Sequence, residues 1–174
     1  SVAWLVRHHL LMSNTAFKRD VDDPKTITDF TAVVQSPERL RLLMVLTEAD
    51  IRAVGPGIWN GWKAGLMRGL YHAAEEVLLG APAMGRMSER VAEAKAALRE
   101  RLSDLSEVDV EDLLGLGYPT YWVGFGTDAH ERHARIIHAA EKAGETLTIE
   151  ITADPDHDAT EVLVYTADHP GLFS

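Results

Sequence analysis

The feature that most constrains the fold is a strongly apolar helical stretch at residues 40–53. Its apolar residues recur at helical spacing and occupy nearly the whole circumference, which predicts a helix in the middle of a bundle. Asp50 follows Leu46 by one turn and Leu43 by two turns, so we expect it to share their face. A carboxylate buried there must be paired, hydrogen-bonded or bound to a metal, because an unpaired buried charge is very costly.

Clear end signals flank this helix. Ser36 is suited to cap it, Pro37 to occupy its first position, and residues 55–57 to end it. A second long helix is expected at 58–79, with glycines four residues apart at Gly57, Gly61, Gly65 and Gly69. The glycines would allow either close approach of a ligand to the backbone or close packing of another helix, and we favour the packing interpretation.

Shorter helices are predicted on both sides of these two. Their expected ranges are 2–13, 26–34 with Thr26 as the cap, 88–102 and 106–114. Residues 13–24 are polar and are expected to form a loop, and residues 81–85 have the composition of a linker.

The pattern changes from residue 118 onward. An aromatic, β-branched run at 121–125 predicts a strand, a helix follows at 128–143 with Gly144 as its stop, and residues 146–152 and 160–166 alternate as strands do. We expect the last two strands to pair antiparallel. The predicted class is therefore α+β, a helical bundle followed by a small βαββ region, divided at 1–80, 81–117 and 118–174.

Composition excludes several kinds of protein. The net charge of −10 without a basic block argues against a nucleic-acid surface, and the lack of cysteine excludes disulfides and thiolate zinc sites. No apolar run approaches the roughly 20 residues that span a bilayer, and no signal peptide is visible, so we expect a soluble cytoplasmic protein without membrane contact. Both ends of the chain look cut, which suggests a piece of a longer protein.

His8 and His9 are the first candidate site residues. Adjacent imidazoles on a helix point about 100° apart, so one or both can join Asp50 at a divalent metal. The alternative is a core histidine that is hydrogen-bonded to the backbone. Three residues are too few for a closed metal shell, so such a site needs further ligands.

Two later groups also contain chemistry-bearing residues. His130, His133 and His138 lie on a helix rich in Glu and Arg, so we interpret them as part of a solvated face rather than a second metal or phosphate site. Near the end of the chain, Gly171 is suited to present backbone N–H groups to a carboxylate, and Asp168 to hold an ammonium group. Together these two would hold an amino acid, or simply form a strand–turn–helix corner.

Several of these segments together resemble one family. Residues 2–13 look like the middle of its HD-type phosphohydrolase domain, and residues 46–53 with 59–63 look like the end of that domain. The bridge into its first ACT domain is resembled by Tyr121-Trp122, by residues 130–135 and by Asp168-His169-Pro170-Gly171-Leu172-Phe173-Ser174. The family is that of the bifunctional uridylyltransferase/uridylyl-removing enzymes that act on the PII nitrogen-signalling protein.

The resemblance implies a parent enzyme that attaches UMP from UTP to PII when glutamine is low and hydrolyses it off when glutamine is high. It implies a divalent metal, Mg or Mn, in the HD domain. Asp50 matches the last acidic metal ligand of such domains, and His8 and His9 match a histidine pair that ligates or catalyses in two-metal relatives. Asp168 and Gly171 would belong to an incomplete glutamine site in the ACT domain.

The chain also departs from the family pattern. The nucleotidyltransferase domain and a suitably placed His-Asp dipeptide are absent, since His157-Asp158 falls in a late turn. We therefore predict that the piece by itself is inactive. The alternatives are a non-catalytic regulatory module that couples amino-acid binding to a partner, and a stand-alone helical interaction protein. Exposed strand edges lead us to expect that a homodimer can form.

Overall fold

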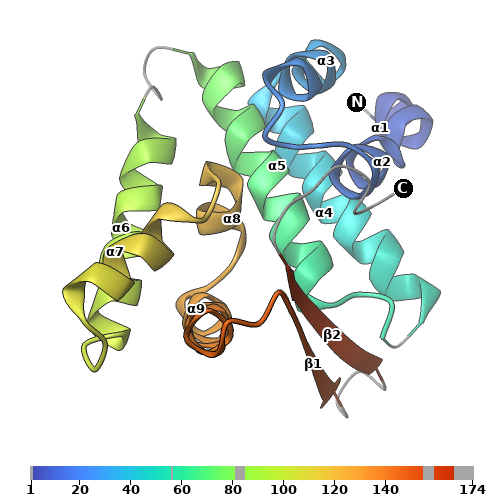
Figure 1. Cartoon of the computed structure of the whole chain (residues 1–174). Coiled ribbons are helices and arrows are strands. Elements are labelled where there is room, and N and C mark those ends of the chain that lie inside the picture. The colour runs from blue at the N-terminus through green and yellow to red at the C-terminus, as the bar shows by residue number, and fades with distance from the viewer. Residues whose placement is uncertain (1, 56, 81–84, 155–158, 167–174) are drawn as a thin grey trace.

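The computed structural model describes residues 2–55, 57–80, 85–154 and 159–166, and within them it is mainly helical with one antiparallel hairpin (Figure 1). The predicted α+β class is confirmed. The elements are α1 (Val2–His8), α2 (Leu11–Lys18), α3 (Pro24–Val34), α4 (Pro37–Val54), α5 (Gly61–Leu79), α6 (Arg86–Arg101), α7 (Glu107–Gly115), α8 (Pro119–Gly124), α9 (Thr127–Ala143), β1 (Leu147–Asp154) and β2 (Ala159–Thr166).

Local chemistry sets most of the helix ends. The Ser36 side chain accepts a hydrogen bond from the backbone N–H of Arg39, and Pro37 is the first residue of α4, as predicted. Gly144 ends α9 with a positive φ of 69°, also as predicted. The cap of α3 is Asp23 and not Thr26, because the helix begins at Pro24 and Thr26 is buried inside its first turns.

Further local predictions are wrong. Residues 121–125 do not form a strand: Pro119 starts a short helix, α8, in which Trp122 is buried. Residues 13–24 are not all loop, since α2 continues to Lys18 and buries Met12 and Ala16 in the core. In both places packing against neighbouring helices overrides the local propensity of the sequence.

The first hydrophobic core is built by α2–α5. Its fully buried members include Met12, Leu40, Leu43, Met67 and Leu70. Figure 1 shows α5 running through the middle of the molecule, with α1–α4 on one side and α6–α8 on the other. The central position therefore belongs to α5, whereas we predicted it for α4.

The exposure of α4 contradicts the prediction drawn from its composition. The buried residues of this helix are Leu40, Leu43 and Thr47. Leu42 is exposed, and Val45 is 69% exposed to solvent. The helix has the predicted length, but one side of it faces water.

A second core joins α6, α7, α8 and α9. Leu98 and Leu102 come from α6 and its end, Leu113 from α7, Trp122 from α8 and Ala134 from α9. Residues on both sides of the boundary predicted at residue 117 contribute to this core. The predicted division into three domains stays a prediction.

Helix α8 packs directly on the backbone of α5. A Cβ atom added to Gly124 would lie 2.6 Å from the carbonyl oxygen of Gly65, and one added to Gly69 would lie 3.1 Å from Thr120. Arg68 Nε donates to the Gly124 carbonyl at 2.8 Å. Close packing, the favoured interpretation of the glycine spacing, is thus confirmed for Gly65 and Gly69, whereas Gly61 has open space around it.

The hairpin β1–β2 has the predicted antiparallel pairing. Its register places Ile149 opposite Val164 and Ile151 opposite Val162. These four residues and Leu147 form one apolar face, and each is between 54% and 68% exposed. The opposite face meets α9, where Arg132 pairs with Glu161 at 2.6 Å and the Tyr165 hydroxyl donates to Glu141 at 3.1 Å.

Throughout the part of the chain that the structure describes, every helix is too short or too polar to cross a membrane.

Candidate functional site

The structure places Asp50 on the exposed side of α4. The predicted burial of this carboxylate is wrong, because the side of α4 that carries Asp50 faces water and is not covered by another helix. His9, which directly follows α1, is also exposed, and its Nδ1 lies 2.8 Å from the carbonyl oxygen of Val6 in that helix. The His8 ring lies against Trp4, with centroids 4.8 Å apart.

The three predicted metal ligands come from neighbouring elements. The Thr47 hydroxyl donates to the His9 carbonyl oxygen at 3.5 Å, which sets the end of α1 beside α4 one turn before Asp50. Within the described ranges, however, no hydrogen bond or ion pair joins the side chains of His8, His9 and Asp50, and no group of three potential metal ligands is found. Their role as ligands and catalytic residues stays a prediction.

Asp168 and Gly171, the predicted amino-acid site, lie outside the described residues.

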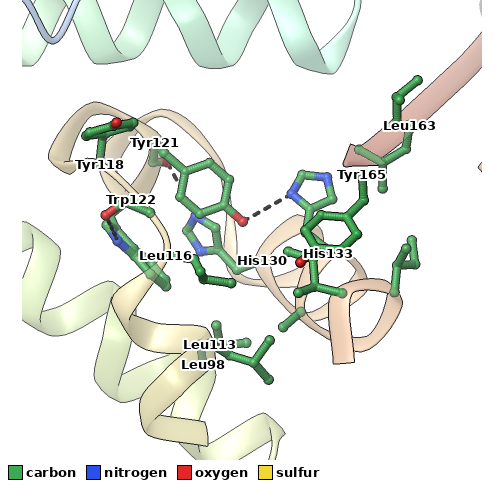
Figure 2. Close-up of a pocket in the computed structure, with 15 residues that line it drawn as sticks. Leu98, Leu113, Leu116, Tyr118, Tyr121, Trp122, His130, His133, Leu163 and Tyr165 are labelled. Carbon is green, nitrogen blue, oxygen red and sulfur yellow. Dashed lines mark hydrogen bonds between the residues drawn. The ribbon is translucent and has the colours of Figure 1, made fainter. Parts of the chain in front are cut away.

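The best-formed cluster of polar and aromatic side chains lies between α8 and α9. It contains Tyr121, His130 and His133, which Figure 2 shows around one pocket. His130 is only 1% exposed, so the solvated face predicted for it is wrong. The charged neighbours on α9 lie on its other sides: Arg135 binds Asp104 at 3.0 Å, and Glu131 binds Arg101 at 3.2 Å.

Hydrogen bonds and ring contacts hold this cluster together. The Tyr121 hydroxyl lies 3.1 Å from His133 Nδ1, and His130 Nε2 lies 3.4 Å from the Tyr121 carbonyl oxygen. The His130 ring is 4.9 Å from the Tyr121 ring and 5.0 Å from that of Trp122. Nδ1 of His130 is buried without a hydrogen-bond partner among the residues described.

The cluster is uncharged near neutral pH. Burial lowers the pKa of His130, and burial together with the nearby Arg132 guanidinium lowers the pKa of His133. Burial also raises the pKa of Tyr121 to about 12. Both imidazoles and the phenol are therefore in their neutral forms, and each can donate and accept hydrogen bonds without carrying a charge.

The pocket beside the cluster has a volume of about 280 Å³. Its other walls are aliphatic and aromatic, with Leu98 and Leu113 on the side of α6 and α7 and Leu163 and Tyr165 on the side of β2. Among the described residues that line it there is no Asp, Glu, Lys or Arg. The arrangement is suited to hold an uncharged molecule.

The spacing of residues along α9 is a sequence signal for this cluster. His130, Ala134 and Ile137 follow each other at helical spacing, and His133 lies beside them on the same stripe. This stripe faces the second core. The number of charged residues in α9 predicts an exposed helix, but their spacing places them on the faces that do not meet the second core.

Comparison with known proteins gives matches over the whole chain. It is 50% identical over 175 aligned positions to the bifunctional uridylyltransferase/uridylyl-removing enzyme of Gluconobacter oxydans (strain 621H), covering 100% of this chain. It is 51% identical over 174 positions to the enzymes of the same name from Azospirillum brasilense and Rhodospirillum rubrum. The chain matches one segment of these enzymes.

The predicted resemblance to the bifunctional uridylyltransferase/uridylyl-removing enzymes is thereby confirmed, while the HD-domain and ACT-domain assignments stay predictions. The chain spans 18% to 19% of the length of these curated relatives. No family model matches it. No solved structure matches it.

Proposed function

We propose that this chain is a segment of an enzyme that both transfers uridylyl groups to a protein and removes them. The observation that supports this most is the overall identity of 50% to 51%, in alignments that span the whole chain, to enzymes with that name. In the whole protein the substrates would be UTP and the PII protein, the control would be by glutamine, and a divalent metal, Mg or Mn, would serve the hydrolysis. The enzyme would work in the cytoplasm.

For the segment alone we propose that neither reaction takes place. Asp50 and His9 are both exposed, and the three predicted ligands are not joined to one another. A metal ion would need ligands beyond His8, His9 and Asp50, because three groups fill only about half of the octahedral coordination sphere of Mg²⁺ or Mn²⁺. Incubating the chain with uridylylated PII and Mn²⁺ is expected to release no UMP above background, and turnover at the rate of a whole enzyme would contradict the proposal.

The role of Asp50 is testable in the whole enzyme. Asp50→Ala is expected to lower the rate of UMP removal by at least about a hundredfold. The rate of UMP transfer should stay within about twofold of that of the unsubstituted enzyme, because only the hydrolytic centre loses a ligand. Glu48→Ala, which removes a carboxylate two residues earlier that pairs with Arg52 at 2.8 Å, is the matched control. Unchanged UMP removal by Asp50→Ala would refute the role.

A second candidate function is coupling between the helical half and the hairpin half. The contacts of α8 favour it: Thr120 donates to Asp22 at 2.6 Å on one side, and Tyr121 bonds His133 on the other. In the whole enzyme, Gly124→Ala is expected to change the glutamine concentration at which removal is half-maximal. Calorimetry of the isolated chain with glutamine is expected to show no binding, and a saturable heat signal would mean that the segment senses glutamine itself.

A further inference from the structure

The structure assigns a small-molecule site to the pocket between α8, α9 and β2. We propose that it binds a small, uncharged aromatic molecule that exchanges one hydrogen bond with the Tyr121–His133 pair. This goes beyond the proposed function and does not depend on it.

Charge decides the class of ligand. The described lining has no charged side chain, and the two arginines of α9 that lie nearest in sequence are paired elsewhere, Arg132 with Glu161 and Arg135 with Asp104. A phosphate or a zwitterionic amino acid would lose hydration in this pocket without gaining an ionic partner. Nucleotides and free glutamine are therefore poor ligands for it.

The volume and the lining of the pocket indicate the size and the aromatic character of the ligand. The volume of about 280 Å³ is close to the lower limit of roughly 300 Å³ for pockets that bind small molecules. Tyr121, Trp122 and Tyr165 contribute aromatic walls, and aliphatic side chains contribute most of the remaining lining. Flat apolar molecules with one or two rings fit such walls, because aromatic rings pack by offset stacking and edge-to-face contact.

The Tyr121–His133 pair supplies the polar contact. A hydroxyl and a neutral imidazole that share one hydrogen bond keep one further donor and one further acceptor, whichever of the two donates to the other. Both side chains line the pocket, and Figure 2 shows the Tyr121 hydroxyl turned toward the His133 ring. A ligand with a single N–H or O–H group can therefore be recognised without any charge.

Indole is a suitable probe, with L-glutamine and UMP as charged comparison compounds. Titration of the intact chain by calorimetry is expected to give saturable one-to-one binding of indole and none of the other two. Leu163→Trp fills the pocket from β2 and is expected to weaken indole binding about tenfold or more. Val162→Trp, on the opposite face of the same strand, is the matched control and is expected to stay within twofold of the unsubstituted chain.

The hydrogen bond is tested separately. Tyr121→Phe is expected to weaken indole several-fold and to change the binding of 1-methylindole, which lacks the N–H donor, by less than twofold. If the tryptophan variant does not fold, the His133 imidazole resonances of the unsubstituted chain provide the same test, since they are expected to shift with indole and not with UMP. Absence of saturable indole binding, equal binding by Leu163→Trp, or tighter binding of UMP would overturn the proposal.

Discussion

Two pairs of histidines in the described part of the chain differ in their spacing and in their surroundings. His8 and His9 are adjacent in sequence, and His9 is exposed at the end of α1. His130 and His133 are three residues apart on α9, and together with Tyr121 they line a pocket under β2. Of these four residues, His130 is buried, His8 and His133 are partly buried, and His9 is exposed.

The difference shows that spacing carries more information than local composition. Residues at i and i+3 share one side of a helix, so a single packing surface can bury both. Adjacent residues diverge by about 100°, so a helix at the edge of a bundle exposes at least one of them. Charged neighbours on α9 did not indicate exposure of the whole helix, since they occupy the sides that the second core leaves free.

The largest contrast is expected from alanine substitution of one histidine from each pair. His130→Ala should lower the free energy of unfolding by about 2–4 kcal/mol, because it leaves a cavity beside Trp122 and Tyr121. His9→Ala should change it by less than about 0.5 kcal/mol, because the side chain is exposed. Urea unfolding followed by circular dichroism measures both, and equal losses would remove the distinction between the pairs.

The support that α5 gives to the cluster of Tyr121, His130 and His133 is tested by Gly124→Ala. The new Cβ would meet the backbone carbonyl of Gly65 at 2.6 Å, so α8 must shift, at a cost of about 1–3 kcal/mol. Gly115→Ala is the control, since it adds the same methyl group at a helix residue with nothing within 4 Å, and it should be neutral within about 1 kcal/mol. A neutral result for Gly124→Ala would mean that α8 is not held against α5 as the structure shows.

A smaller effect is expected from removing one hydroxyl. Tyr121→Phe deletes the hydrogen bond to His133 and should lower the free energy of unfolding by about 1 kcal/mol. Tyr165→Phe deletes a hydrogen bond to Glu141 in a more exposed position and should cost less than about 0.5 kcal/mol. Thermal unfolding of the two variants side by side shows whether the rank order holds.

The smallest expected effect is in the dependence of stability on pH. The lowered pKa of His130 and His133 means that the unfolded chain binds protons more readily than the folded chain. Their contribution to stability is therefore complete above the unfolded pKa of about 6.5 and is lost as the pH falls through their lower folded pKa values. His133→Gln should flatten the change in unfolding temperature between pH 7.5 and 5.5.

Part of that pH dependence should persist in the variant. Burial also lowers the pKa of His72, which lies beside Arg90 at 2.7 Å between α5 and α6. Stability that rises on acidification over the same interval would contradict the assignment of neutral imidazoles.

Sequence reasoning succeeded where a few neighbouring residues decide the outcome. Ser36 and Pro37 start α4, Gly144 ends α9, and the alternation at 146–152 and 160–166 gives the antiparallel pair. Each of these depends on backbone chemistry or on strand periodicity within a short window.

It failed where the outcome depends on distant parts of the chain. The aromatic run at 121–125 has the composition of a strand, but α8 forms because Trp122 fills the second core and Gly65 admits the helix backbone. Asp50 is exposed because nothing packs on that side of α4, which the composition of one helix does not reveal. The pocket escaped prediction for the same reason, since α6, α7, α8, α9 and β2 all contribute to it.

The hairpin exposes its apolar face to solvent, and this affects the solubility of the chain at high concentration. The five aliphatic side chains of this face form a continuous apolar strip that is exposed to solvent. They are Leu147, Ile149, Ile151, Val162 and Val164. Ammonium sulfate makes the hydration of exposed apolar surface less favourable, so we expect salting-out to involve this strip first. Ile151→Lys should therefore raise the salt concentration needed for precipitation more than Val108→Lys on α7.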